Sequence, residues 1–402
     1  MTFPIGKLNS IWGEPIYKGK IDFNDPLGPI SIDTRTLAKG NFFVPLIGVN
    51  FNGHHFLEVA SRKGAQAAVV SKKSGISIPE SMTCWEVDDT LSAFHELSLL
   101  SRLNLNIPVV AITGSVGKTT TREIIKSLLS PLGKILSTDE NKNNEVGVPL
   151  TLVQASSEHV AAVIEMGMRG IGEIEKLSFC AQSGIAVITN IGTAHIGRLG
   201  SRNQIAKAKC EITSYLRPSG VVIIPGDDPL LENTLKKNWS GRIKRVKLKG
   251  DYSDELNNCS NSNIDLGEEL DCIGELDLKR SLVTIQGNIC ELPLPGRHNA
   301  LNFVLSVAVA RELNVPWAKI MKTKVSTPGG RNSRIQLKGI TIFDETYNSS
   351  LESVKAALEL LITQPGRHFA VLGTMLELGS YSIPFHKIMI EEVLRLGLDG
   401  LV

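Results

Sequence analysis

The sequence lacks the features that mark most secreted, membrane-spanning and nucleic-acid-binding proteins. Its 6 cysteines among 402 residues are scattered, without CxxC pairs or metal-ligand spacing, which favours free thiols in a reducing compartment. No apolar run approaches the roughly 18 residues of a membrane helix, and the N-terminus has no signal-peptide pattern. The 43 basic residues nearly balance the 41 acidic ones, so no basic surplus points to nucleic acid. These absences predict a cytoplasmic protein without nucleic-acid or membrane partners.

Several domains are expected from the length, because 402 residues with 42% hydrophobic content can form two to four cores. Residues 1–104 read as a small α/β unit, residues 105–315 as a central α/β domain, and residues 316–402 as a further α/β domain. The last pattern stops about halfway through a doubly wound sheet, so we expect this domain to be incomplete. The polar stretch at 250–280 predicts a loop or an added hairpin without an assigned function.

Four apolar runs in the central region have the continuous hydrophobicity of strands that are buried on both faces. They are Val109–Thr113, Ala161–Met166, Ile185–Ile191 and Val221–Ile224. Such strands are typical of a parallel, doubly wound α/β sheet, which is the fold class we predict.

A phosphate-binding loop is the strongest local signal. The first apolar run leads directly into a glycine-rich loop and then a helical pattern; the residues are Gly114, Ser115, Val116, Gly117, Lys118, Thr119 and Thr120. Glycines let backbone N–H groups face an anion, and the helix N-terminus adds its dipole. In this pattern Lys118 reaches the β- and γ-phosphates, and the Thr119 hydroxyl can ligate Mg²⁺. The loop predicts a nucleoside triphosphate ligand, without deciding between kinase, GTPase, motor and ligase.

Polar residues after two later strands, and a lysine on a later helix, are candidates for a magnesium site. Glu165 ends a predicted buried strand, where doubly wound sheets collect their ligands, and a buried carboxylate needs a partner or a metal. His195 follows the next strand, although a single histidine there is more often a surface residue. Lys209 lies on a predicted helix, where a solvated face is the simpler interpretation when it is taken alone.

Taken together, these segments resemble the Mur ligase family. The matching segments are DTRTLAKGNFFVPLIGVNFNGHHF (33–56), TGSVGKTTTRE (113–123), NKNNEVGVPLTL (141–152), EMGMRGIGEI (165–174), TNIGTAHIGRLGS (189–201), AKAKCEI (206–212), PGRHNALN (295–302), GGRNSRIQ (329–336), DETYNSSLESVKAAL (344–358) and VLGTMLELG (371–379). They run in family order through most of the chain. Three of them, at 141–152, 344–350 and 371–379, resemble the members that add D-alanyl-D-alanine to a UDP-N-acetylmuramoyl-tripeptide.

The resemblance implies a three-domain, ATP-dependent acid–amino-acid ligase of peptidoglycan synthesis that uses ATP and Mg²⁺ and acts through an acyl phosphate. It implies catalytic roles for Lys118, Lys209 and His195. It also implies magnesium contacts from Thr119, Glu165, His195 and a carbamylated Lys209. Further ATP contacts are expected from Asn299, Arg331, Asp344 and Glu345, and contacts to the UDP-sugar substrate from Thr34, Arg35, Asn143 and Asn144. We expect a monomer.

Two departures from the family pattern concern carboxylates. Glu345 replaces a usual aspartate but keeps the carboxylate, whereas Thr374 replaces a usual aspartate and loses the carboxylate.

The nearest alternative function is that of a sibling amide ligase, either a single-amino-acid-adding Mur enzyme or a folylpolyglutamate synthetase. A protein that only binds the nucleotide is an alternative of another class. A kinase or GTPase would leave Glu165, His195 and Lys209 without a role.

Overall fold

The computed structural model describes residues 3–16, 19, 21–250, 271–326, 329–331 and 333–402. The chain forms two compact units. The first comprises Met1–Ile107, Glu145–His159 and Phe179–Gln182, and the second comprises Pro108–Asn144, Val160–Ser178 and Ser183–Val402. Residues 316–402, expected as a separate domain, fall within the second unit, so the predicted three-part division stays a prediction.

The first unit is built on a four-stranded parallel sheet in the order β1-β2-β3-β4. The strands are β1 (Ile30–Ser31), β2 (Phe42–Phe43), β3 (Ala67–Ser71) and β4 (Cys84–Val87), and the helices include α1 (Asn9–Trp12), α2 (Leu57–Arg62), α3 (Thr90–Leu103) and α5 (Gly147–Leu152). Asp89 caps α3 by accepting hydrogen bonds from the N–H groups of Leu91 and Ser92. Aromatic and aliphatic side chains, among them Phe42 and Trp85, fill the core.

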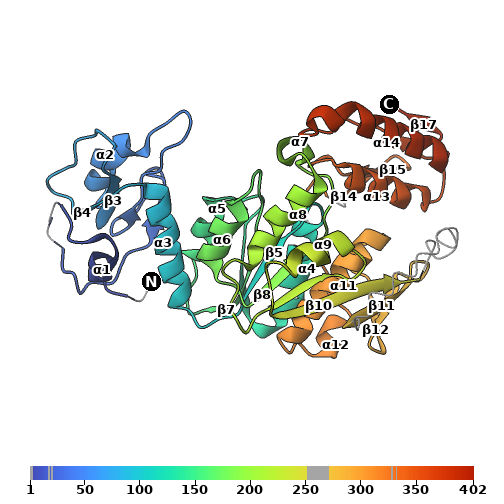
Figure 1. Ribbon diagram of the computed structural model, residues 1–402, viewed down its shortest axis with the longest axis horizontal. Coiled ribbons are helices and arrows are strands. Elements are labelled where there is room, and N and C mark those ends of the chain that lie inside the picture. Colours follow the sequence, from blue (N-terminus) through green and yellow to red (C-terminus); the bar gives the residue numbers. More distant parts are fainter. Residues whose placement is uncertain (1–2, 17–18, 20, 251–270, 327–328, 332) are drawn as a thin grey trace. The chain divides into compact units, whose positions relative to one another are not determined.

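The second unit contains a nine-stranded sheet in the order β13-β12-β11-β10-β9-β8-β5-β7-β6 (Figure 1). Its strands are β5 (Val109–Thr113), β6 (Lys134–Ser137), β7 (His159–Glu165), β8 (Ile185–Ile188), β9 (Val221–Pro225), β10 (Arg242–Lys249), β11 (Cys272–Asp277), β12 (Leu282–Ile285) and β13 (Asn288–Glu291). The pairings that join β7, β5, β8, β9, β10 and β11 are parallel. The predicted α/β class with a central, largely parallel sheet is confirmed.

The sheet departs from a purely parallel one at one edge, because β12 pairs antiparallel with β11 and with β13. Buried positions alternate along β11 and β12, as they do in strands with one covered face. The stretch predicted as an insertion at 250–280 therefore ends in a strand of the sheet, whereas its residues 251–270 lie outside the described part of the chain.

Helices cover the central sheet and place the functional segments. They are α4 (Lys118–Leu129), α6 (Glu173–Ala181), α7 (Ile196–Leu199), α8 (Arg202–Cys210), α9 (Pro229–Leu235), α11 (Arg297–Glu312) and α12 (Trp317–Ile320). Helix α11 packs against α4 and against β9 to β11. Because eleven of its sixteen residues are buried, α11 is the central core helix of this unit.

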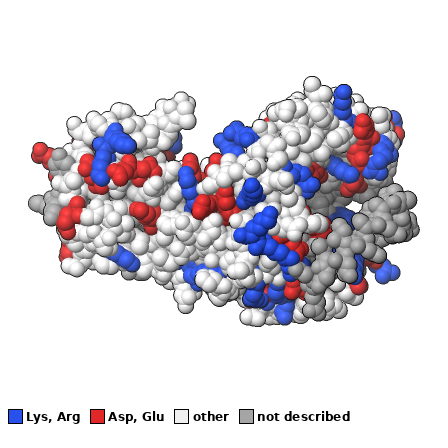
Figure 2. All heavy atoms as spheres, viewed as in Figure 1, with Lys and Arg blue, Asp and Glu red and all other residues white. Residues whose placement is uncertain are grey.

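The C-terminal segment of the second unit begins with an antiparallel hairpin, β14 (Ser333–Leu337) and β15 (Ile340–Asp344). It continues through α13 (Leu351–Ile362), β16 (Phe369–Ala370), α14 (Ser382–Leu396) and β17 (Gly400–Leu401), and β16 pairs parallel with β17. Ser350 and Ser353 form a capping box at the start of α13. In the described part of the chain, no helix is long and apolar enough to cross a membrane. Figure 2 shows basic and acidic side chains interspersed over the face in view.

Candidate nucleotide and magnesium site

The phosphate loop leaves the fully buried strand β5 and turns through two glycines with positive φ, Gly114 at 151° and Gly117 at 83°. A Cβ on Gly114 would lie 1.8 Å from Oγ1 of Thr189, and one on Gly117 would lie 2.8 Å from Oδ1 of Asn302. Both positions therefore need glycine for conformation and for space. The predicted strand, glycine loop and helix occur in the expected order.

The segment that follows β8 anchors this loop. The Ser115 N–H donates to the main-chain oxygen of Asn190 at 3.2 Å, and the Val116 N–H donates to its side-chain oxygen at 3.1 Å. Oγ1 of Thr189 donates to the Val116 oxygen at 2.6 Å, and the Gly192 N–H donates to Oγ of Ser115 at 2.9 Å. These bonds hold the loop in place before a ligand arrives.

Helix α4 offers main-chain donors to an anion. The first intrahelical hydrogen bond of α4 runs from the Thr121 N–H to the Gly117 oxygen at 2.8 Å. The N–H groups of the residues just before Thr121 therefore lack intrahelical acceptors. Nζ of Lys118 folds over the loop and donates to the oxygens of Gly114 at 2.8 Å and Ser115 at 3.3 Å. The site thus combines a cation with the positive end of a helix.

Electrostatics link Lys118 to the other predicted residues. Burial lowers the pKa of Lys118, Glu165 opposes that shift, and Arg331 adds to it. Lys118 in turn contributes to lowering the pKa values of His195 and Lys209. Four residues predicted from separate segments therefore lie within electrostatic range of this lysine.

Glu165 stands at the end of β7 with both carboxylate oxygens engaged. Oε2 lies 3.1 Å from Nη1 of Arg122, and Oε1 accepts a hydrogen bond from Nδ2 of Asn143 at 2.8 Å. The Glu165 N–H donates to Oγ1 of Thr138 at 2.8 Å. Arg122 was not predicted as a partner of Glu165, although its position in α4, four residues after Lys118, was an available signal.

His195 is the N-cap residue of helix α7 and has a left-handed backbone at φ 65°. Its Nδ1 contacts Oε2 of Glu377, and Nη2 of Arg198 lies 3.4 Å from the other oxygen of that carboxylate. Burial lowers the pKa of His195, the Glu377 carboxylate opposes that shift, and the nearby charges of Lys118 and Lys209 strengthen it. Sequence reasoning missed Glu377, which lies in the segment 371–379.

Lys209 is buried near the end of α8, with 2% of its surface exposed. Among the residues that the structure describes, no carboxylate lies within ion-pairing distance of its amine. Burial, followed by the charge of Lys118, therefore holds the pKa of Lys209 well below its usual range. The interpretation of Lys209 as part of a solvated helix face was wrong. A lysine of lowered pKa presents a larger fraction of neutral, nucleophilic amine.

The donors present fit a magnesium ion only in part. Within the described residues, no group of three or more His, Cys, Asp and Glu side chains is placed to hold a metal ion. Glu165 supplies a carboxylate, and the buried Thr119 supplies a hydroxyl. So few protein donors can serve Mg²⁺, which commonly keeps several waters and takes one or two carboxylates along with substrate phosphates. The fit is partial because both Glu165 oxygens already contact Arg122 and Asn143.

The remaining predicted ATP contacts have protein partners in this structure. Nδ2 of the buried Asn299 donates to the oxygen of Pro295 at 2.7 Å. The Arg331 guanidinium stacks over the Tyr347 ring, with Cζ 3.5 Å from the ring centroid. Asp344 accepts hydrogen bonds from the N–H and Oγ1 of Thr346, and these bonds lower its pKa. Glu345, beside Asp344, is half-buried.

The predicted UDP-sugar contacts are divided between the two units. Thr34 and Arg35 belong to the first unit, where Arg35 is ion-paired with Asp33 at 2.6 Å. Asn143 and Asn144 belong to the second unit. The Asn143 amide is bound to Glu165, and Asn144 is exposed. The roles of all four residues toward a substrate stay predictions.

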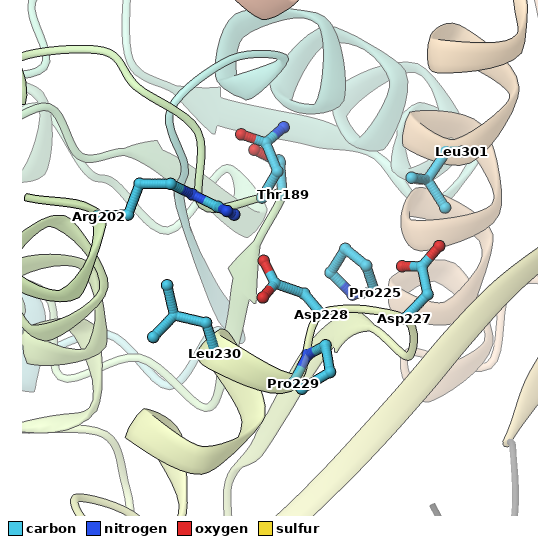
Figure 3. Close-up of a pocket in the computed structure, with 9 residues that line it drawn as sticks. Thr189, Arg202, Pro225, Asp227, Asp228, Pro229, Leu230 and Leu301 are labelled. Atoms are coloured by element: carbon cyan, nitrogen blue, oxygen red, sulfur yellow. The ribbon is translucent and has the colours of Figure 1, made fainter. Parts of the chain in front are cut away.

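A pocket of about 420 Å³ opens beside the loop anchors (Figure 3). It is lined by Thr189, Asn190, Arg202, Pro225, Asp227, Asp228, Pro229, Leu230 and Leu301. Sequence reasoning missed this pocket, although its two aspartates follow the buried strand β9 just as Glu165 ends β7. Thr189 and Asn190 both anchor the phosphate loop and line the pocket, so the pocket adjoins the loop.

A glycine loop between a buried strand and a helix, with a lysine folded over it and a carboxylate at the neighbouring strand end, defines an α/β phosphate-loop protein. Residues 112–310 match the Mur ligase middle domain, and with the relatives described below this shows that the chain belongs to the Mur ligase family.

Relatives and solved structures agree on the family. A UDP-N-acetylmuramoyl-tripeptide--D-alanyl-D-alanine ligase of Synechocystis sp. is 40% identical over 92% of this chain and 78% of its own length. The Bacillus subtilis ligase of the same name is 36% identical over 89% and 76%. A crystal structure of MurF from Acinetobacter baumannii superposes with a TM-score of 0.85 at 30% identity, covering 99% of this chain and 85% of that one.

Proposed function

We propose that this chain catalyses the ATP-dependent joining of D-alanyl-D-alanine to a UDP-N-acetylmuramoyl-tripeptide, in the cytoplasm and as a monomer, during peptidoglycan precursor synthesis. The relatives carry this reaction in their names, and a Thermotoga maritima MurF, 27% identical with a TM-score of 0.79, was solved in complex with ADP. The observation that supports the proposal is the phosphate loop itself, where Nζ of Lys118 folds over the oxygens of Gly114 and Ser115 at the N-terminus of α4.

In the proposed mechanism the loop holds the triphosphate in line with the terminal carboxylate of the tripeptide. That carboxylate attacks the γ-phosphorus, the bond to the β–γ bridging oxygen breaks, and ADP leaves. Lys118 and the N–H groups of α4 offset the charge that develops on the transferred group. The neutral amine of the dipeptide then attacks the acyl carbon, phosphate departs, and the amine loses its proton as the amide forms.

Magnesium, when bound, would screen the phosphate charges. Thr119, Glu165 and His195 would hold it, together with Lys209 in carbamylated form. The neutral Lys209 amine adds to carbon dioxide and releases one proton, which gives an anionic carbamate. Burial keeps the amine neutral and therefore able to react, and the charge of Lys118 disfavours the ammonium form and attracts the anionic carbamate. An anion at this position neighbours a cation without repulsion.

The pocket beside the loop would take the nucleoside half of ATP. Leu301 offers it an apolar wall and Asp228 a hydrogen-bond acceptor. Asn299 lies in the first turn of the same helix as Leu301. Arg331, Asp344 and Glu345 would contact ATP from the C-terminal segment. Thr34, Arg35, Asn143 and Asn144 would contact the UDP-sugar end of the other substrate.

The test is product analysis with the purified chain, ATP, Mg²⁺ and UDP-N-acetylmuramoyl-tripeptide. We expect phosphate release and a product larger by one dipeptide when D-alanyl-D-alanine is added, and neither in the Lys118→Ala variant. Turnover with single amino acids but not with the dipeptide would identify a sibling ligase instead. ATP binding without phosphate release in the presence of all substrates would make the chain a nucleotide-binding protein and overturn the proposal.

A further inference from the structure

Glu377 joins the C-terminal segment to the loop that carries His195. Oε2 of its carboxylate contacts Nδ1 of His195, and its main-chain oxygen accepts the N–H of Gly197 at 3.0 Å. The other carboxylate oxygen lies 3.4 Å from Nη2 of Arg198. One residue from a distant part of the chain therefore contacts three residues of a single turn.

The backbone on both sides of this contact is unusual. His195 and Glu377 are non-glycine residues with left-handed φ values of 65° and 60°. Such a conformation costs on the order of 1–3 kcal/mol and persists where the surroundings impose it. Gly197 lets the two backbones approach, since a Cβ there would lie 2.5 Å from the Gly379 nitrogen. The turn is thus held in a conformation that brings the His195 ring to the carboxylate.

The chemistry of the imidazole gives this contact a consequence. A neutral histidine that donates its Nδ1–H to a carboxylate keeps a lone pair on Nε2, so the partner decides which nitrogen is the acceptor. We propose that Glu377 is the positioning residue for His195, and that it fixes the tautomer and ring orientation that present Nε2 to the phosphate and metal site. This inference rests on the proposed function, because that function gives Nε2 its task.

The proposal also links assembly of the site to docking of the C-terminal segment. Glu377 lies after β16, so His195 acquires its partner only when that segment is docked on the loop.

A second carboxylate on the same loop serves as the matched control. Glu352 accepts hydrogen bonds from the Thr193 N–H at 2.7 Å and from Oγ1 of Thr193 at 3.1 Å. It docks the C-terminal segment as Glu377 does, but it orients no imidazole. Docking alone would make the two glutamates equivalent, whereas a positioning role distinguishes Glu377.

The experiment compares Glu377→Met, which removes the acceptor for Nδ1–H, with Glu352→Met and Arg198→Met. The tautomer of His195 is read from its imidazole ¹⁵N shifts in histidine-labelled protein, and Mn²⁺ affinity is measured in the presence of ADP by electron paramagnetic resonance. We expect the Nδ1-protonated tautomer in the wild type, its loss in Glu377→Met, and about tenfold weaker Mn²⁺ binding. Glu352→Met and Arg198→Met should keep the tautomer and keep the Mn²⁺ affinity within about twofold.

An unchanged His195 tautomer in Glu377→Met, or equal effects of Glu377→Met and Glu352→Met, would overturn the inference. Thermal melting shows whether each variant is folded. If Glu377→Met unfolds, Glu377→Ala, which also removes the acceptor, replaces it with the same expected results. Neither readout requires ligation, so an inactive wild type would count against the proposed function while the ¹⁵N shifts still decide the role of Glu377.

Discussion

Arg122 and Glu165 form a buried ion pair between the helix that follows the phosphate loop and the end of the neighbouring strand. Nη1 of Arg122 lies 3.1 Å from Oε2 of Glu165, and their side chains are only 1% and 2% exposed. Glu123 also pairs with Arg122, at 2.6 Å. The pair explains how a carboxylate can be buried at the end of β7, since an unpaired charge there would be costly.

Removing one member of this pair should be strongly destabilising. Arg122→Met leaves the Glu165 carboxylate buried without its cation, and we expect the free energy of unfolding to fall by about 3–5 kcal/mol. Lys126→Met is the control, because Lys126 is half-exposed and contacts Glu123 at 3.8 Å; its loss should cost less than about 1 kcal/mol. Urea unfolding of both variants checks this, and similar values for the two would contradict it.

The phosphate loop should not tolerate a methyl group at Gly114. In Gly114→Ala the new Cβ would lie 1.8 Å from Oγ1 of Thr189, so the loop anchors must move and we expect ATP affinity to fall at least tenfold. Gly172→Ala is the matched control, since Gly172 also has a positive φ, 83°, but no atom within 4 Å of the added carbon. It should lose about 1 kcal/mol of stability and bind ATP normally. Calorimetric titration with ATP measures both affinities, and equal losses would refute the steric explanation.

Short patterns along the sequence were sufficient to predict the phosphate loop and the parallel strands. The order of glycines, lysine and threonine from Gly114 to Thr120 is readable along the chain. The continuous apolar run of Val109–Thr113 corresponds to strand β5, because a strand covered on both faces has no alternation. Glu165 was predictable for a similar reason, since ligands gather at the carboxyl ends of such strands.

Partners from distant segments were not predictable from one sequence. Nothing in the spacing of Glu377 connects it with His195, because only the folded chain brings the two together. Strands β12 and β13 were missed as sheet members because they lie past the polar stretch. For Lys209 a usable signal existed: Ile205 and Lys209 are four residues apart and share the buried face of α8.

Acid should destabilise the protein through His298, which lies in the first turn of α11 beside Asn299. Burial lowers the pKa of His298 to about 4, from an ordinary value of 6.5. Between pH 4 and 6.5 His298 is protonated in the unfolded chain but neutral in the folded one. Its contribution to the free energy of unfolding is therefore fully present above pH 6.5 and is lost as the pH falls to 4, by at most about 3 kcal/mol. His298→Gln should flatten this part of the profile, and His55→Gln, at an exposed position, should not. Urea unfolding from pH 4 to 8 measures the slopes, and parallel profiles for wild type and His298→Gln would rule out this assignment.

Replacing Lys209 with an apolar residue should strongly lower the ligation activity without lowering the stability of the protein. The pKa of Lys209 is held well below the usual value by burial, so between the folded and unfolded pKa values the unfolded chain binds more protons, and the stability of the wild type rises with pH. Lys209→Met replaces the buried amine with an apolar side chain of similar length, which removes that slope. In buffer free of carbon dioxide we expect Lys209→Met to unfold at a free energy equal to the wild type or higher by about 1–3 kcal/mol, while ligation falls at least about 100-fold because no carbamate can form. Lys207→Met, two residues away and exposed, should leave activity and stability unchanged.

Ligation assays with and without added bicarbonate, beside urea unfolding at pH 7 and 9, test both expectations. A Lys209→Met protein that is folded and fully active would exclude the carbamate, whereas one that is markedly less stable at pH 7 would show that the amine is not buried without a partner.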